Sequence, residues 1–192
     1  RYFEAKNAYI SSLSIAPDQA AVYASVAYLC KELGGYEEAI AYYILAIELA
    51  PETFGWLHNL AQIYLELGRC EEAKIACLKA IDTSTDYPVA YSTLSNILVN
   101  LKCYDEAEAA ALNAINAAPD SPIAYCALGN VLFELKKFTE SEEAYRQALR
   151  LSPDDAVAYC NLGTVLMALG QIEGAEDTYK EAIICDPFLA DA

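Results

Sequence analysis

Seven cysteines and one histidine are the side chains of this 192-residue chain that are best suited to covalent or metal chemistry. The cysteines form no CxxC pair, and one histidine cannot complete a zinc set of cysteines and histidines at the usual spacing. The sequence also contains no Walker loop, no GxGxxG or HExxH motif, and no serine or cysteine nucleophile with a histidine base. We therefore expect no catalytic residue, no metal and no cofactor, and we predict that the protein is not an enzyme.

The cysteines are better explained as small apolar packing residues. Two of them, Cys126 and Cys160, are 34 residues apart and occupy equivalent positions of the repeat described below. Equivalent atoms in stacked helix pairs are separated by about 10 Å per helix layer, which is too far for a disulfide. We predict free thiols in a reducing compartment and hence a cytoplasmic location.

The elements that position these side chains follow a repeat of 34 residues. Five windows align without an insertion or deletion: 20–53, 54–87, 88–121, 122–155 and 156–189. Position 8 of each window is small, and so is position 20. The residues at position 8 are Ala27, Ala61, Ser95, Gly129 and Gly163, and position 27 holds Ala46, Ala80, Ala114, Ala148 and Ala182. Small residues at fixed spacing let helices approach closely, so the pattern predicts a stacked array.

Each window contains two stretches with apolar residues spaced i, i+3, i+4 and i+7, and no stretch alternates as a strand does. A short turn separates the two stretches at positions 14 to 17, as in residues 33–36 and 67–70. The glycines of these turns suit the end of a helix. The sequence therefore predicts an all-α chain in which each window forms two antiparallel helices.

The recurring pattern Y-x-x-L-G…A-x-x-x-Y-x-x-A…P resembles that of the tetratricopeptide repeat family. The resemblance covers nearly the whole chain and implies an α-α superhelix, a right-handed solenoid of antiparallel helix pairs. Departures from the pattern are few. Thr85 replaces a proline, and Cys77 and Ala111 replace the aromatic residue at position 24.

The two ends of the chain are also placed by the repeat. Residues 1–19 match the second half of a window, and residues 190–192 match the start of a further one. We therefore expect a single tetratricopeptide array over residues 1–192, cut from a longer array.

The net charge of −16 comes from 28 acidic and 12 basic residues. Many acids stand where helices begin, and we expect those at position 33 to cap the first helix of the next window. They are Asp18, Glu52, Asp86, Asp120 and Asp154. Others occupy positions 18 and 19, the first turn of the second helix, where the helix dipole favours negative charge. So few basic residues disfavour nucleic acid and anionic membranes, and the apolar runs are too short for membrane insertion.

The resemblance implies that the first helices of successive repeats line a concave groove. Amide side chains in it would hold the backbone of a ligand, and the residues at position 12 would accept apolar side chains. The predicted peptide-binding residues are Tyr28, His58, Asn59, Gln62, Leu65, Asn96, Val99, Asn130, Phe133, Asn161 and Met167. We expect His58 to be an exposed polar residue of this surface. The alternative for position 12 is that neighbouring helices partly cover it.

The partner expected from these residues is a protein or peptide with apolar side chains. Glu32, Glu66 and Glu134 at position 13 would in addition favour basic ones. Members of the family that bind the acidic C-terminal tail of chaperones need lysine or arginine at positions 2, 5 and 6. This chain has neither at those positions, so we do not expect it to bind the chaperone tail.

Three functions are compatible with the sequence. The first is a non-enzymatic scaffold for protein-protein interaction. The second is the substrate-recruiting array of a larger enzyme, such as a protein O-glycosyltransferase, whose asparagines at position 6 are matched by Asn59 and Asn161 but not by the other three windows. The third is a self-assembly module.

Overall fold

The computed structural model describes residues 2–84 and 87–187, and these residues form eleven helices and no strand. The helices are α1 (Tyr2–Leu13), α2 (Ala20–Glu32), α3 (Tyr36–Leu49), α4 (Phe54–Glu66), α5 (Cys70–Thr83), α6 (Pro88–Asn100), α7 (Tyr104–Ala117), α8 (Pro122–Glu134), α9 (Phe138–Leu151), α10 (Ala156–Ala168) and α11 (Ile172–Cys185). The predicted all-α class and its paired helices are confirmed. The first helix of every window begins at the first residue of that window.

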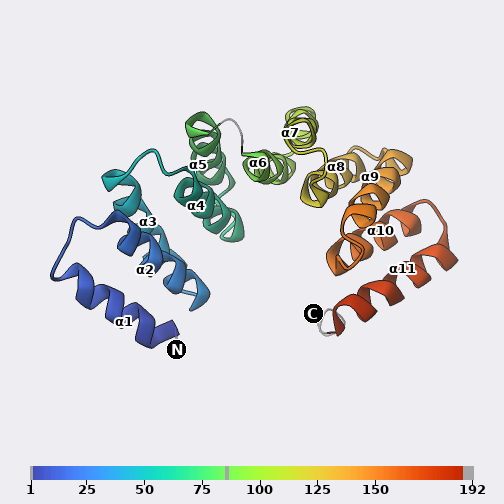
Figure 1. Cartoon of the computed structure of the whole chain (residues 1–192). Coiled ribbons are helices and arrows are strands. Elements are labelled where there is room, and N and C mark those ends of the chain that lie inside the picture. Colours follow the sequence, from blue (N-terminus) through green and yellow to red (C-terminus); the bar gives the residue numbers. More distant parts are fainter. Residues whose placement is uncertain (1, 85–86, 188–192) are drawn as a thin grey trace. The chain divides into compact units, whose positions relative to one another are not determined.

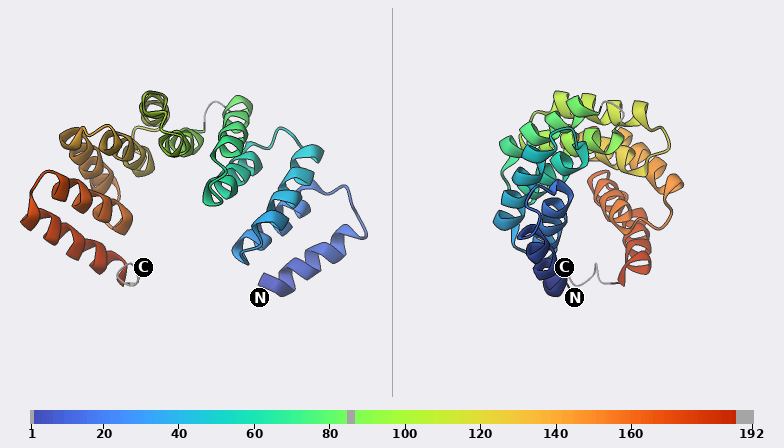
Figure 2. Two further views of the ribbon diagram at one scale, coloured as in Figure 1. Left: turned by 180° about the vertical axis from the view of Figure 1, so that it is seen from behind. Right: turned by 60° about the vertical axis from the view of Figure 1, so that its left-hand side comes forward.

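The chain divides between α5 and α6 into two compact units. In the first unit α2 packs on α3 and α4 on α5, with α1 against α2 (Figure 1). The second unit consists of the pairs α6/α7, α8/α9 and α10/α11, which Figure 2 shows from two further directions. The expected start of a further repeat at 190–192 lies outside the described residues. The expectation of one continuous array stays a prediction.

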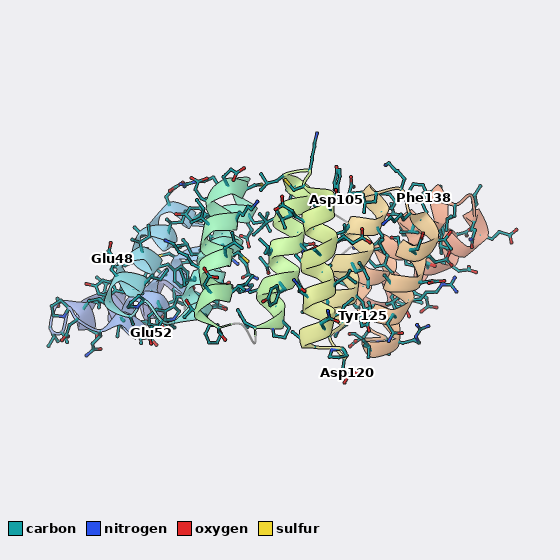
Figure 3. The ribbon with its side chains drawn as sticks, turned by 90° about the horizontal axis from the view of Figure 1, so that it is seen from above. Glu48, Glu52, Asp105, Asp120, Tyr125 and Phe138 are labelled. Atoms are coloured by element: carbon teal, nitrogen blue, oxygen red, sulfur yellow. The ribbon has the colours of Figure 1, made fainter. Side chains whose placement is uncertain are left out.

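In the second unit the turns within pairs lie at one edge and the connections between pairs lie at the other. Figure 3 shows Asp105, at the start of α7, and Phe138, at the start of α9, at the first edge, and Asp120, between α7 and α8, at the opposite edge. This arrangement follows from antiparallel helices of nearly equal length.

Small side chains at the predicted positions lie where the helices of a pair cross. All five alanines at position 27 are fully buried, and so are the residues at position 20: Ala39, Ala73, Ala107, Ser141 and Ala175. The Ser141 hydroxyl donates to the backbone carbonyl of Gly129 at 2.8 Å, which ties α9 to α8. The small residues predicted from the repeat are therefore those that close packing of the core requires.

Each turn within a pair needs one residue in the left-handed region. Gly34, Gly68 and Gly170 have φ between 71° and 77° there, as expected for a helix C-terminus. In the two other windows the same place is taken by Lys102 and Lys136, with φ of 60° and 63°. A non-glycine residue in this conformation is strained.

The acids at the starts of the second helices lie in the first helical turn, as predicted; Glu37 and Glu38 of α3 are examples. The capping prediction for position 33 was wrong by one residue, because the N-cap of each first helix is at position 34. Among the described first helices, only Asp155 uses its N-cap side chain, which accepts from the Ala158 backbone amide at 3.0 Å. Asp154 instead accepts from the Ser152 hydroxyl. Asp86 lies outside the described residues.

Candidate functional site

Three predicted asparagines meet in a cavity of about 340 Å³ in the second unit. Asn96 comes from α6, Asn130 from α8 and Asn161 from α10, and α6 contributes a second amide, that of Asn100. Val99 and Phe133, also predicted, line the same cavity, together with Glu134. This surface is named the asparagine groove.

Hydrogen bonds give the amides of this groove a common direction. The Tyr145 hydroxyl donates to Asn130 Oδ1, and Asn130 Nδ2 donates to Asn96 Oδ1 at 3.2 Å. Burial raises the pKa of Tyr145, so the hydroxyl keeps the proton that begins this chain of bonds. Both carbonyl oxygens accept within the chain, and N–H groups are therefore what its Asn96 end offers to a ligand.

Sequence reasoning treated position 24 as a packing position and missed Tyr145 as part of the groove. The ring of Tyr145 packs on Gly129, where a Cβ would lie only 2.8 Å from the ring. In the last repeat Tyr179 packs in the same way on Gly163, and its hydroxyl lies 3.2 Å from the Thr164 hydroxyl. A glycine at position 8 combined with a tyrosine at position 24 is the signal that could have identified this contact.

The apolar row at position 12 is only partly available. Leu65, Val99 and Phe133 are half-buried, whereas Met167 is 50% exposed. Phe133 also packs on Phe138, with ring centroids 5.4 Å apart, and on the core of the second unit. Neighbouring side chains therefore cover Phe133 in part, while it still lines the asparagine groove.

Two predicted residues of the first unit, Tyr28 and Asn59, line a different cavity of about 660 Å³. Four of the other nine described residues that line it are aromatic. The cavity is named the tyrosine pocket and is lined chiefly by Tyr2, Tyr9, Tyr28, Tyr43, Trp56 and Asn59. Gln62 and Leu65, on the same helix as Asn59, are half-buried and line neither of the two cavities, and Met167 also lies outside both.

His58 is not exposed, contrary to the prediction. Its side chain is buried within the first unit at 4% exposure. Burial, and then the nearby Lys31 ammonium, lower its pKa, so the imidazole is held neutral. Position 5 is buried in the first three windows, with Ala24 and Ser92 equivalent to His58, because it faces the neighbouring helices.

One of the glutamates expected to attract a basic ligand already has a partner. Glu66 pairs with Lys31 at 2.9 Å across two successive repeats. Glu134 lines the asparagine groove itself. Of these two acids, Glu134 is therefore the one placed to meet a basic side chain of a ligand.

None of the seven cysteines forms a disulfide. Burial raises the pKa of Cys77 and Cys126 to about 12, which makes these thiols poor nucleophiles near neutral pH. Within the described ranges no three histidine, cysteine or acidic side chains gather as metal ligands would. No helix in the same ranges has the length and apolar character needed to cross a membrane.

Family models match most of the repeat region. A model described as tetratricopeptide repeat matches residues 20–53 and 57–87, a second with the same description matches 156–185, and one described as TPR repeat matches 129–170. No curated protein sequence matches the chain.

Several solved structures share the fold. TTC0263, a thermophilic TPR protein of Thermus thermophilus, has a TM-score of 0.81 at 21% identity, with 90% of this chain and 94% of that chain covered. YrrB, a TPR protein with an unusual peptide-binding site, has a TM-score of 0.65 at 21% identity over 94% and 93%. The APC/C hetero-tetramer Cut9-Hcn1 matches with a TM-score of 0.82 at 19% identity, over 97% of this chain but 37% of the matched one.

Proposed function

Because the chain belongs to the tetratricopeptide repeat family, we propose that it is a non-enzymatic scaffold that binds a peptide segment of a partner in the asparagine groove. The repeats and their structural neighbours support a protein-interaction scaffold in general. The observation that carries the finer proposal is the bond chain from Tyr145 through Asn130 to Asn96.

This chain of bonds suits a peptide backbone. Its N–H donors meet the carbonyl oxygens that every peptide presents, so it gives affinity without selecting a sequence. Selection would then come from the side chains beside it. Val99 and Phe133 offer apolar contact, and Glu134 offers a carboxylate for a basic residue.

For the test, peptides that bind the wild-type chain are selected from a random peptide library. Their affinities for the wild-type chain and for Val99→Asp are then compared. The added carboxylate would remove the apolar contact and is expected to weaken the selected peptides by about tenfold or more. Leu112→Asp is the matched control, since Leu112 is 46% exposed on α7 and lines neither cavity. Circular dichroism checks that both variants fold. Equal binding to all three proteins would show that the groove is not the binding surface.

Of the two other functions, only self-assembly predicts a different outcome for Val99→Asp. An array that recruits substrates for a larger enzyme would use the same groove. Catalytic activity would then be measurable only in a longer chain that includes the enzyme domain. A self-assembly module would bind a second copy, so light scattering over a dilution series would show an oligomer that Val99→Asp disperses.

A further inference from the structure

A third hollow of the first unit lies between α3 and α5 and is mainly apolar. It encloses about 360 Å³, and α4 forms its floor with the buried side chains of Leu57 and Leu60. Ile44 on α3 and Ile75 on α5 line the two walls and are 40% and 56% exposed. Both walls and the floor belong to these three helices, and we name the surface the isoleucine groove. Large apolar side chains that stay exposed on both sides of one hollow mark a surface for a partner.

The repeat shows that these isoleucines are not required by the fold. Ile44 is at position 25 of its window, and Ile75 is at position 22 of the next. In the second unit the equivalent pairs are Leu112 with Glu143, on α7 and α9, and Arg146 with Asp177, on α9 and α11. At least one charged side chain stands in each of those pairs, and the helices form nevertheless. An apolar residue on both walls is therefore a particular feature of the isoleucine groove.

Charged side chains of opposite sign stand on the two walls. Glu48 on α3 and Lys79 on α5 both line the groove, and both are exposed. Because α3 and α5 are equivalent helices of successive repeats, they run in the same direction, and both side chains lie in the second half of their helix. Glu48 and Lys79 have no ion-pair partner among the described residues. The third charged residue of the lining, Glu72, already pairs with Arg69 at 2.8 Å.

This arrangement is complementary to a second copy of the same surface. A two-fold axis sets the α3 wall of one copy against the α5 wall of the other, so each contact occurs twice. Glu48 of each copy then meets Lys79 of the other. The projecting Ile75 side chain can enter the groove of the other copy, as ridges of one helix enter the grooves of another. A second copy therefore pairs both charges and covers both apolar walls.

We propose that the isoleucine groove binds a second copy of this chain in a two-fold symmetric dimer, held by Ile44 and Ile75 and by reciprocal pairs of Glu48 with Lys79. The groove shares no lining residue with the asparagine groove, so the proposal goes beyond the proposed function and does not rest on it. Such a dimer presents two asparagine grooves. A partner with two binding segments would then be held with greater avidity than a partner with one.

The first test measures the mass of the full chain by light scattering over a dilution series from about 1 μM to about 1 mM. The net charge of −16 opposes association, so the buffer contains about 0.15 M salt, which screens charges more than about 8 Å apart. The mass is expected to rise from one chain to two. Ile75→Asp should weaken the dimer about tenfold or more, because it places a carboxylate in the apolar contact. Leu112→Asp is the matched control, since Leu112 is 46% exposed and lies outside the isoleucine groove.

The second test exchanges the two charges. Glu48→Lys and Lys79→Glu each place like charges opposite one another, so each is expected to weaken the dimer about tenfold or more. An equimolar mixture of the two variants should dimerise as the wild type does, because each variant carries the charges that the other lacks. Glu143→Lys controls for the change in net charge, since Glu143 is exposed on α9 and outside the groove. Circular dichroism checks that every variant folds.

Three results would overturn the proposal. The first is a wild-type chain that stays a monomer at every concentration; peptide binding in the asparagine groove is measured separately, and that proposal would then stand or fall alone. The second is a charge variant that associates as the wild type does, or a mixture that stays monomeric, since reciprocal pairing excludes both. The third is loss of the dimer in Val99→Asp but not in Ile75→Asp, which would place self-association in the asparagine groove.

Discussion

The hydrogen-bond partner of the tyrosine hydroxyl at position 24 differs between repeats with glycine and with alanine at position 8. With Gly129 or Gly163 at position 8, the tyrosine crosses its own repeat and reaches position 9. With Ala27 there, Tyr43 instead contacts Asn59 at position 6 of the next repeat. The two arrangements go with an alanine and a glycine at position 8, and a Cβ at Gly129 or Gly163 would overlap the ring.

Gly129→Leu tests this contact. A leucine would overlap the buried Tyr145 ring, which lies 2.8 Å from the place of a Cβ, and overpacking of this kind costs about 1–3 kcal/mol of unfolding free energy. The measurement is urea unfolding followed by circular dichroism. Gly55→Leu is the matched control on α4, since no atom lies within 4 Å of a Cβ there. A Gly129→Leu protein as stable as the wild type would mean that the ring yields freely.

At the scale of elements, the turn between the helices of a pair is where residue type and backbone conformation agree least well. Lys102 holds a φ of 60°, and Lys136 one of 63°, where the other windows have glycine. The Lys136 ammonium lies 5.7 Å and 5.9 Å from the ring centroids of Phe133 and Phe138, which compensates part of the strain by cation–π attraction. No such ring contact accompanies Lys102 among the contacts that the structure describes.

Lys102→Gly is therefore expected to raise the free energy of unfolding by about 1 kcal/mol, since glycine adopts the left-handed conformation without strain. Lys136→Gly should gain less, because it loses the contact with two rings. Urea midpoints of the two variants give the comparison. A fall in stability for Lys102→Gly would show that the lysine side chain has a stabilising role that outweighs its backbone strain.

At the scale of the whole molecule, the predicted single array has a thermodynamic consequence. The period of 34 continues without a break from the windows of the first unit into those of the second. In an array, repeats stabilise their neighbours, so damage to one repeat propagates to others. Two independent units would not transmit it.

Ala148→Leu distinguishes these cases. Ala148 is fully buried in the second unit, so the change should cost about 1–3 kcal/mol there. Trp56 reports unfolding of the first unit, and circular dichroism reports all helices. A single array predicts that both transitions move to lower urea together. A Trp56 transition that keeps its midpoint would mean that the two units unfold separately.

Much of this molecule was predictable from its sequence. The 34-residue period places α2, α4, α6, α8 and α10 at their observed first residues, and small side chains at positions 20 and 27 mark the helix crossings. These features are local, because a helix follows the spacing of apolar residues and a close crossing excludes any large side chain. Asn96 and Asn130 at position 9 and Asn161 at position 6 were predicted to face one groove from the resemblance to the family, and the three line one cavity.

Tertiary structure alone decided the burial of His58, the part played by Tyr145 in the asparagine groove, and the tyrosine pocket. Each depends on where a neighbouring helix places its side chains, and a pattern within one helix does not contain that information. His58 occupies a position that was expected to face a ligand, yet adjacent helices cover it. Tyr145 reaches the groove because Gly129 leaves space for its ring. The period thus determined which helices exist and how they pair, whereas the packing of individual side chains between helices decided which surfaces remain open to a partner.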